Sequence, residues 1–264
     1  MTKSYKMAVL AITALIIISI IFFVSKSQKN ANSVMGDALI VGVSPDYPPF
    51  EYTENGEIVG FDIDFIHELG KKMDKKIEIK EMEFSSLIPS LNAGKVDVII
   101  SSISKNSERM DNVSFSDPYY TSTFAMIMMK DTDAKKMDDF PKDAKVGVQT
   151  GSTMESFANT YNDSSDKSLT IVSLGSNFLL IEKLKLGEID VLIVEDAQAP
   201  SFIKNIPNLK SETIEDEVYI DEEENSYVIG VKKDSSLVEE INKGIEGLNT
   251  DGQIEFLLKK WDLR

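Results

Sequence analysis

The chain of 264 residues contains no cysteine and only one histidine, His67. Without thiols the protein has no disulfide, no zinc–thiolate site and no cysteine nucleophile. We also expect no attachment through a lipid-modified N-terminal cysteine. His67 falls in a predicted helix over residues 62–73, beside charged residues. That position favours an exposed histidine over a metal ligand or a catalytic base, so we expect no metal site and no cofactor.

The common catalytic motifs are missing as well. The sequence holds no Gly-x-x-x-x-Gly-Lys-Ser/Thr loop, no Gly-x-Ser-x-Gly elbow and no His-Glu-x-x-His zinc motif. Because most nucleophilic and metal-dependent reactions lack their residues here, a binding function is favoured over catalysis. We predict no catalytic residues.

Basic residues are scarce, with 28 lysines and arginines against 44 acidic residues. Four of the lysines lie in the first 34 residues, which leaves 24 basic against 44 acidic residues in the remainder. A body this acidic repels the phosphate backbone, so no nucleic-acid partner is expected.

The N-terminal region contains one long apolar run, Met7–Val24, with lysines on both sides. Its 18 residues exceed the ~7–15 of a secretory signal but fall short of the ~20 of a spanning helix. A weak cleavage site at residues 31–33 lies well beyond the run, which favours an uncleaved membrane anchor over a signal peptide. Residues 25–37 form a polar tether. In both cases the rest of the chain is extracytoplasmic, at the cell surface or in the periplasm.

Short apolar runs alternate with helical patterns over the rest of the chain, which predicts parallel α/β sheets. The pattern occurs twice, in the first and second halves. The predicted strands cover 38–43, 76–82, 96–101, 124–129, 145–149, 170–174, 190–194 and 227–231. The predicted helices cover 62–73, 86–94, 177–186, 237–248 and 253–261, with one more opening at 150.

Candidate binding residues follow the predicted strands, where open α/β sheets hold their ligands. The segment 101–109 offers serines and then Arg109, whose guanidinium can clamp a carboxylate. The alternative is an N-capped helix with Arg109 on a solvated face. Tyr47 and Phe84 follow the first two strands and could enclose a small side chain. In the second half, a helix start near 150–154 could attract a carboxylate and Glu195 an ammonium, so the two charges suit an α-amino acid.

Several short segments, in this order and spacing, resemble one family. They are Asp46–Tyr52, Gly60–Asp64, Phe84–Ser90, Asp97–Arg109, Phe115–Tyr120, Val146–Ser152, and Leu248–Gly252 with Trp261. Over about residues 38–264 the chain resembles the polar amino acid substrate-binding proteins of ABC transporters, which are solute-binding proteins of family 3 and type II periplasmic binding proteins.

The resemblance implies an α/β, two-lobed Venus-flytrap fold with two hinge crossovers, preceded by one N-terminal hydrophobic helix. Residues 1–37 would be the signal peptide or anchor with its tether. Lobe 1 would comprise 38–119 and 227–264, and lobe 2 would comprise 123–222.

The resemblance also implies roles for single residues. Arg109 matches the carboxylate-binding arginine, and Ser104 stands where a threonine usually supports the same carboxylate. Ser102 matches the position whose backbone carbonyl receives the α-amino group. Tyr47 and Phe84 match the aromatic or apolar walls.

In the second lobe, Thr153 matches a position that touches the carboxylate after closure, and Glu195 stands where an aspartate often takes the ammonium. Ser44 departs from the pattern, because several relatives have there an aspartate that reads the ligand side chain. Asp46 or Gln149 could compensate for the lost acid. Basic and polar neutral amino acids therefore both stay open as ligands.

The predicted function is capture of a free polar or basic L-amino acid and its delivery to the permease subunits of an ABC importer. Residues 7–24 would hold the protein at the membrane if they are not cleaved. The alternative is a dehydratase of the cyclohexadienyl or arogenate type on the same fold, with Glu195 as the proton donor.

Overall fold

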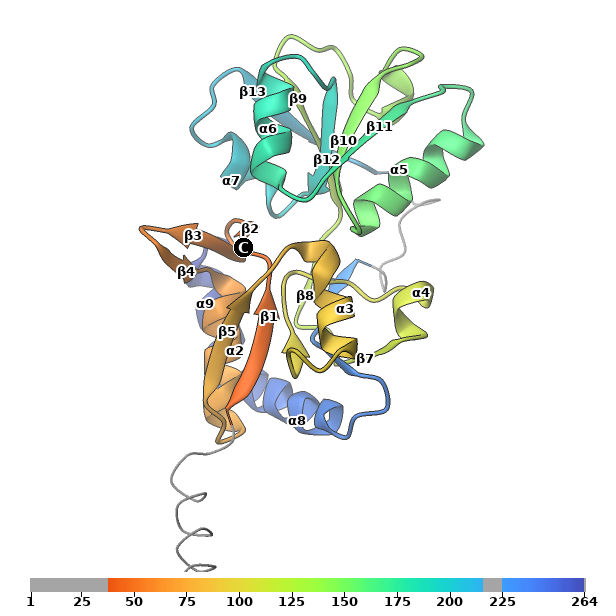
Figure 1. Ribbon diagram of the computed structural model, residues 1–264. Coiled ribbons are helices and arrows are strands. Elements are labelled where there is room, and N and C mark those ends of the chain that lie inside the picture. Colours follow the sequence, from red (N-terminus) through yellow and green to blue (C-terminus); the bar gives the residue numbers. More distant parts are fainter. Residues whose placement is uncertain (1–37, 216–224, 264) are drawn as a thin grey trace, which may run out of the picture.

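The computed structural model describes residues 38–215 and 225–263, which form two α/β lobes stacked on one another (Figure 1). The apolar run over residues 7–24 and the tether lie outside the described residues. Within the described ranges, no helix combines the length and the apolar character needed to cross a membrane.

The first lobe is built on a five-stranded mixed sheet of order β5-β1-β6-β15-β7. Its strands are β1 (Leu39–Val43), β5 (Ile77–Glu81), β6 (Val98–Ile99), β7 (Val113–Phe115) and β15 (Gly230–Lys232). Strand β1 pairs in parallel with β5 and β6, whereas β15 runs antiparallel to β6 and β7. The C-terminal part of the chain therefore completes the sheet that the N-terminal part begins.

Helices cover both faces of this sheet. Helices α2 (Phe61–Lys72), α8 (Leu237–Thr250) and α9 (Gln253–Lys260) pack together on one face, and α3 (Leu87–Asn92) packs on the other. Side chains along a strand point alternately to the two faces. Accordingly, Val98 and Ile100 pack with the α2 side, whereas Ile99 packs with Leu87 and Leu91 of α3.

The second lobe repeats this arrangement with the order β11-β10-β12-β9-β13. Its strands are β9 (Phe124–Met129), β10 (Lys145–Gln149), β11 (Thr170–Leu174), β12 (Val191–Glu195) and β13 (Leu209–Thr213). Helix α5 (Thr153–Ser164) covers one face, and α6 (Asn177–Lys185) with α7 (Ala199–Ile203) covers the other. In each lobe a central strand, β1 or β10, has parallel neighbours and an antiparallel strand lies beyond them.

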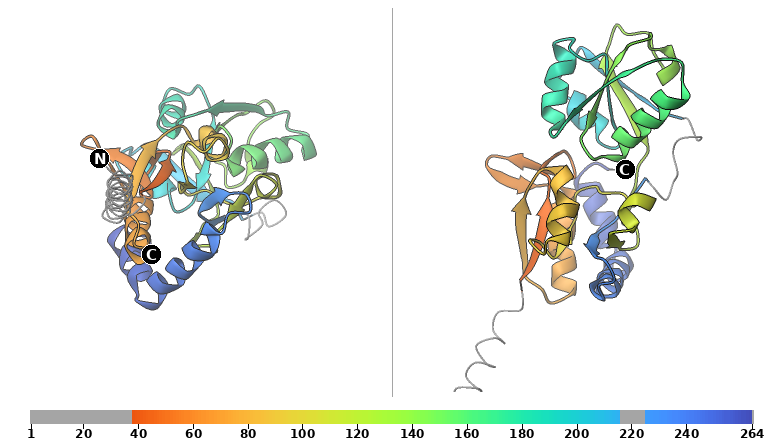
Figure 2. Two further views of the ribbon diagram at one scale, coloured as in Figure 1. Left: turned by 60° about the horizontal axis from the view of Figure 1, so that its bottom comes forward. Right: turned by 45° about the vertical axis from the view of Figure 1, so that its right-hand side comes forward.

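The right-hand view of Figure 2 shows the two lobes one above the other, with the chain passing between them. Two short strands lie beside this passage. Strand β8 (Tyr120–Thr121) pairs antiparallel with β14 (Ser226–Tyr227). The chain leaves the first lobe through β8 and re-enters it through β14, so the predicted two-lobed fold with two crossovers is confirmed. The lobe boundaries given above stay a prediction.

An aromatic cluster supports the crossovers from the side of the first lobe. The ring of Phe50 meets those of Tyr120 and Tyr227 edge-on, with centroids 5.2 and 5.0 Å apart. The rings of Phe65 and Tyr119 stack with centroids 4.7 Å apart. Such aromatic pairs stabilise the fold by more than their buried area alone would. The crossovers therefore adjoin a well-packed part of the first lobe.

Some elements differ from the predicted ones. The strand expected over 227–231 is split into β14 and β15, and the helix expected over 86–94 is preceded by a 3₁₀ turn, η1 (Phe84–Ser86). Elements without a prediction include β7, β13, α7 and η2 (Met137–Asp139). A three-stranded sheet of β2 (Asp46–Tyr47), β3 (Glu51–Glu54) and β4 (Glu57–Val59) was not predicted either, whereas α4 (Ser107–Met110) lies where an N-capped helix was the alternative. One feature of the sequence does indicate this sheet: Asn55-Gly56 is a preferred hairpin turn, and both residues have positive φ in the structure.

Candidate functional site

One pocket lies between the two lobes at the carboxyl ends of their parallel strands. All nine residues predicted to bind the ligand line it, together with five others. The lining residues are Ser44, Asp46, Tyr47, Glu51, Phe84, Ser101, Ser102, Ser104, Arg109, Gln149, Ser152, Thr153, Met154 and Glu195. The structure thus brings the predicted residues together, and their contact with a ligand stays a prediction.

Arg109 reaches into the pocket from the short helix α4. Asn106 caps this helix by accepting a hydrogen bond of 2.8 Å from the backbone N–H of Arg109. The guanidinium donates to the Ser104 carbonyl and, at 2.9 Å, to the Gly151 carbonyl of the second lobe. It also lies over the ring of Phe84, 5.6 Å from the centroid. The expected cap is present, but Arg109 is only 8% exposed, so a solvated arginine is excluded.

Ser102 has an unusual backbone conformation at the floor of the pocket. Its φ of 46° is uncommon for a residue with a side chain. Its N–H donates a 2.7 Å hydrogen bond to Oδ2 of the buried Asp62. Strained backbone of this kind persists where the surroundings hold it, often at ligand sites. Asp62 is therefore a positioning residue for Ser102.

Asp62 itself is placed by the start of helix α2. The first two amides of α2 donate to carbonyls of the loop before β3: Phe61 N–H to Pro49 O at 3.0 Å and Asp62 N–H to Phe50 O at 2.9 Å. Gly60 permits this close approach, because a Cβ there would lie 2.0 Å from the Phe50 carbonyl oxygen. The same contact brings Glu51 beside Asp62.

Glu51 is a buried acid in the pocket wall, only 1% exposed. Its carboxylate accepts hydrogen bonds from Ser101 Oγ at 2.8 Å and from Ser102 Oγ at 3.4 Å. Burial and the neighbouring Asp62 raise the pKa of Glu51 well above its usual value. Burial also raises the pKa of Asp62, to about 6, although Ser102 N–H and the Tyr119 hydroxyl bond to it.

Asp46 links the first lobe to the second. Its carboxylate accepts from Gln149 Nε2 at 3.2 Å and from the backbone N–H of Asn177 at 2.8 Å. Asn177 is the first residue of α6, so the carboxylate lies at the positive end of that helix. Ser44 Oγ adds a longer contact of 3.4 Å. Burial raises the pKa of Asp46 more than these hydrogen bonds lower it.

Glu195 enters the pocket from the end of β12 in the second lobe and is 3% exposed. Its backbone N–H donates to the Tyr47 hydroxyl of the first lobe at 3.4 Å. Its Oε2 is buried, and no donor of the described chain meets the geometry of a hydrogen bond to it, although the Tyr227 hydroxyl lies close enough to lower the pKa of the carboxyl group. Burial, and then the charge of Asp196, raise the pKa of Glu195 well above its usual value. A ligand ammonium would satisfy this oxygen.

The N-terminus of α5 forms the second-lobe side of the pocket. Ser152 caps the helix and accepts a 3.2 Å hydrogen bond from the Glu155 N–H. Thr153 is the first helical residue, and its hydroxyl donates to the Met154 sulfur at 3.6 Å. The amides of a helix start attract a carboxylate, and contact of Thr153 with a ligand carboxylate stays a prediction.

Sequence reasoning missed Glu51 altogether and named Asp46 only as a substitute for the acid missing at Ser44. Glu51 follows Pro48, Pro49 and Phe50, in a stretch that resembles a loop. The only signal was an isolated acid among proline and aromatic residues. Ser101, Ser152 and Met154 lie within the predicted segments 101–109 and 150–154 but were not named as single binding residues.

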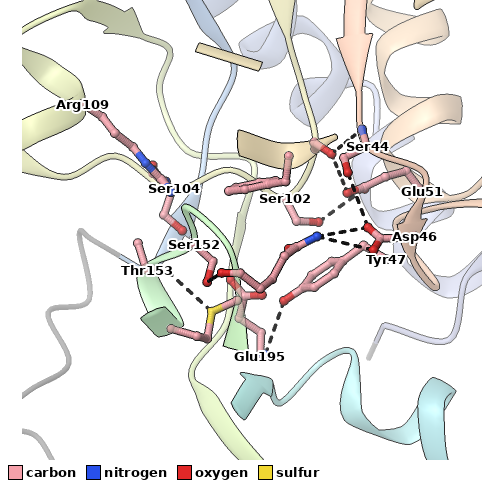
Figure 3. A pocket seen from close by; sticks show the side chains of 14 residues that line it. Ser44, Asp46, Tyr47, Glu51, Ser102, Ser104, Arg109, Ser152, Thr153 and Glu195 are labelled. Carbon is pink, nitrogen blue, oxygen red and sulfur yellow. Dashed lines mark hydrogen bonds between the residues drawn. The ribbon is translucent and has the colours of Figure 1, made fainter. Parts of the chain in front are cut away.

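Charge is distributed unevenly across the pocket (Figure 3). The Arg109 side chain lies at one end, whereas Ser44, Asp46 and Glu51 lie at the other, with Glu195 entering from the second lobe. Three carboxyl groups therefore face a single guanidinium. The pocket can hold an anion at the arginine and two cationic groups elsewhere. Within the described ranges, no group of acidic or histidine side chains is arranged to hold a metal ion.

Known proteins resemble this chain in sequence and in structure. Residues 39–263 match the family described as bacterial extracellular solute-binding proteins, family 3. The arginine-binding extracellular protein ArtP of Bacillus subtilis (strain 168) is 34% identical over 239 residues, which cover 89% of this chain and 90% of ArtP.

Two solved structures of an ancestral arginine-binding protein are similar as well. The structure bound to arginine has a TM-score of 0.79 and 34% identity, with 86% of this chain and 99% of that chain covered. The structure bound to glutamine has a TM-score of 0.78 and 33% identity, with 87% and 100% covered.

Proposed function

The chain belongs to the bacterial extracellular solute-binding proteins of family 3, and we propose that it captures a free basic L-amino acid, with L-arginine as the first candidate. One observation carries this choice: the pocket sets three carboxyl groups against one guanidinium. An α-amino acid with a neutral side chain balances Arg109 and one carboxylate. A basic amino acid adds a cation for the acids at the far end.

The proposed ligand lies along the length of the pocket. Its carboxylate binds the Arg109 guanidinium, with help from Ser104 and the start of α5 near Thr153. Its ammonium binds the Glu195 carboxylate and the Ser102 carbonyl. Because most of the lining side chains are buried, these charge-assisted hydrogen bonds are stronger than they would be on the surface.

The ligand side chain passes between Tyr47 and Phe84 toward the acidic end. There its cation meets Glu51, with Ser44, Asp46 and Gln149 close by. Glu51 takes the place of the acid missing at Ser44, because Ser101 joins the two positions. Ser101 Oγ donates to Glu51 Oε1 at 2.8 Å and accepts the Ser44 N–H at 2.9 Å.

The relatives support a basic amino acid as the ligand, and one of them also supports a neutral amino acid as the alternative. ArtP is named for arginine, and the ancestral protein was solved with arginine and with glutamine. Glutamine has the same α-carboxylate and α-ammonium as arginine but no side-chain cation. The acidic end of the pocket is therefore the part that should separate the two ligands.

The protein works outside the cytoplasm in this proposal and hands its ligand to the permease subunits of an ABC importer. Closure of the two lobes around the ligand would create the surface that the permease accepts. Residues 7–24 would act either as an uncleaved anchor or as a signal peptide. Mass spectrometry of the mature N-terminus in the native host separates these two cases.

Isothermal titration calorimetry of the purified full-length protein, in detergent micelles, tests the ligand. We expect L-arginine to bind most tightly among the twenty amino acids, with lysine and histidine weaker and D-arginine as the negative control. Tight binding of a neutral or acidic amino acid without binding of any basic one would refute the proposed specificity.

A dehydratase reaction is the second candidate because the buried Glu195 carboxyl can hold a proton. We expect no turnover, since the unpaired Oε2 suits an ammonium and the pocket offers a second acidic end. Incubation with prephenate and arogenate, followed spectroscopically, checks this point. Product formation that disappears in Glu195→Gln would establish catalysis.

A further inference from the structure

We propose that Glu51 and Asp62 share one proton until a cationic ligand side chain displaces it, so that this proton decides between cationic and neutral ligands. The proposal rests on the proposed function, because it concerns the same pocket and the same ligand class. It assigns Asp62, which lies behind the pocket wall, a part in ligand selection.

The two carboxyl groups lie on either side of Ser102. The Ser102 hydroxyl donates to Glu51 Oε2 at 3.4 Å, while the Ser102 N–H donates to Asp62 Oδ2 at 2.7 Å. Asp62 is fully buried and Glu51 nearly so. Their other donors are neutral hydroxyls, Ser101 Oγ for Glu51 and the Tyr119 hydroxyl for Asp62. Neither carboxyl forms an ion pair with a described residue.

Two buried carboxylates without a cation cannot both stay ionised, because each disfavours the charge of the other. One proton on the pair removes this repulsion. The proton is held more tightly by Glu51 than by Asp62, because hydrogen bonding between the two groups raises the pKa of Glu51 and lowers that of Asp62. The proton therefore lies on the residue that faces the pocket, where it can leave to solvent.

Other titratable groups around the pair do not supply the missing positive charge. Asp46 adds a further negative charge next to Glu51. Tyr119 stays neutral, because burial and Asp62 raise its pKa. Across the pocket, Arg109 donates to two backbone carbonyls and Glu195 is a further acid. The groups that face the pair are thus Asp46, Tyr47, Tyr119, Arg109 and Glu195.

A cationic side chain at Glu51 would replace the proton. The guanidinium keeps its own charge, one proton leaves Glu51 for water, and the net charge of the site is unchanged. A neutral amide instead leaves the proton in place and can bond to the protonated carboxyl. The same residues can therefore accept arginine with the pair ionised and glutamine with the pair protonated.

The pH dependence follows from the direction of each shift. The pKa of Glu51 lies well above its usual value before binding, and a bound cation lowers it. Arginine therefore binds with full affinity above the pKa of the unliganded pair. Below that pKa its affinity falls by about tenfold per pH unit, until the pKa of the complex is reached. The affinity for glutamine changes less over the same interval.

Calorimetry in buffers of different ionisation enthalpy counts the protons that binding releases. Glu195 can also lose a proton when any α-ammonium binds, so the count for glutamine is subtracted from the count for arginine. We expect the difference to approach one proton at a pH between the pKa of the complex and that of the unliganded pair, so both counts are measured over a range of pH. If arginine binds and the two counts are equal, the shared proton is refuted while the proposed function stands. If arginine does not bind, the proposed function itself fails.

Variants locate the proton. In Glu51→Gln the difference between the two counts should vanish, and glutamine should bind at least as well as arginine. Asp62→Asn keeps an acceptor for the Ser102 N–H but removes the neighbouring charge, so the difference should shrink. Glu54→Gln, an exposed acid on the same strand, should behave as wild type. An undiminished difference in Glu51→Gln would overturn the assignment.

Discussion

The two lobes have the same sheet plan, yet they contribute to the pocket in different ways. The first lobe supplies nine of the fourteen lining residues, including Arg109 and Glu51. Its polar groups are held by bonds within the lobe, such as those from Ser101 and Ser102 to Glu51. The second lobe supplies Glu195, whose Oε2 is buried without a partner in the described chain, and the start of α5.

This difference indicates a division of work. In the first lobe, Asp62 holds the strained backbone of Ser102, which under the proposed function lets this lobe select a ligand before closure. Under the same proposal, the second lobe adds groups that every amino acid can use, an acid for the ammonium and helix amides for the carboxylate. Selection for the side chain should therefore belong to the first lobe, and retention of the α-amino acid moiety to both.

The largest effect is expected from Arg109→Ala in the first lobe. The ligand carboxylate would be buried without its cation, which costs about 3–5 kcal/mol, or more than a hundredfold in affinity. Arg109→Lys keeps the charge but loses the paired donors of the guanidinium. Its affinity for the ligand should therefore lie between those of the wild type and Arg109→Ala. Calorimetry measures the affinities, and thermal unfolding checks that both variants fold. Wild-type affinity in Arg109→Ala would remove the central contact of the proposed site.

A smaller effect is expected from Glu195→Gln in the second lobe. The amide can still accept a hydrogen bond from the ammonium, but the charge assistance is lost, which costs about 2 kcal/mol or roughly thirtyfold. Because the ammonium is common to all ligands, arginine and glutamine should weaken to the same extent.

Asp166→Asn, an exposed acid in the second lobe, serves as the control for this variant. A loss confined to arginine would mean that Glu195 reads the side chain, and the division between the lobes would then be wrong.

The smallest effect is expected from Asp46→Ala, which removes a link between the lobes. The N–H of Asn177 and the Gln149 amide lose their acceptor in the closed form, which costs about 1 kcal/mol or fivefold in affinity. Single-molecule energy transfer between dyes on the two lobes should show a smaller closed population. Glu54→Ala, an exposed acid in the first lobe, should leave closure unchanged. If the closed population of Asp46→Ala equals that of the wild type, the hydrogen bonds of Asp46 do not stabilise the closed form.

Much of the fold could be predicted because its signals are local. The strands β1, β9, β10 and β12 each lie within a residue or two of the predicted apolar runs. Helices cover both faces of their sheets, so these strands consist almost entirely of apolar residues. The three-stranded sheet β2–β4 was missed because Pro45, Pro48 and Pro49 resemble a loop. Its pairing depends on contact with α2 rather than on local alternation.

Much of the candidate site could be predicted as well, because Tyr47 and Phe84 come shortly after β1 and β5, Arg109 lies in the segment after β6, and Glu195 ends β12. Glu51 could not be predicted, because its importance comes from partners distant in sequence. Ser101 lies 50 residues away from it. Asp62 acts through Ser102, 40 residues away along the chain.

The sequence by itself determined the alternation of strands and helices in two halves and the absence of thiol chemistry. These follow from local patterns of apolar residues and from composition, which need no knowledge of distant contacts. Only the tertiary structure decided that Glu51, Asp62 and Ser102 meet, and that Asp46 reaches helix α6. Burial and proximity change the ionisation of a carboxyl group, and both arise only when segments far apart in the chain pack together.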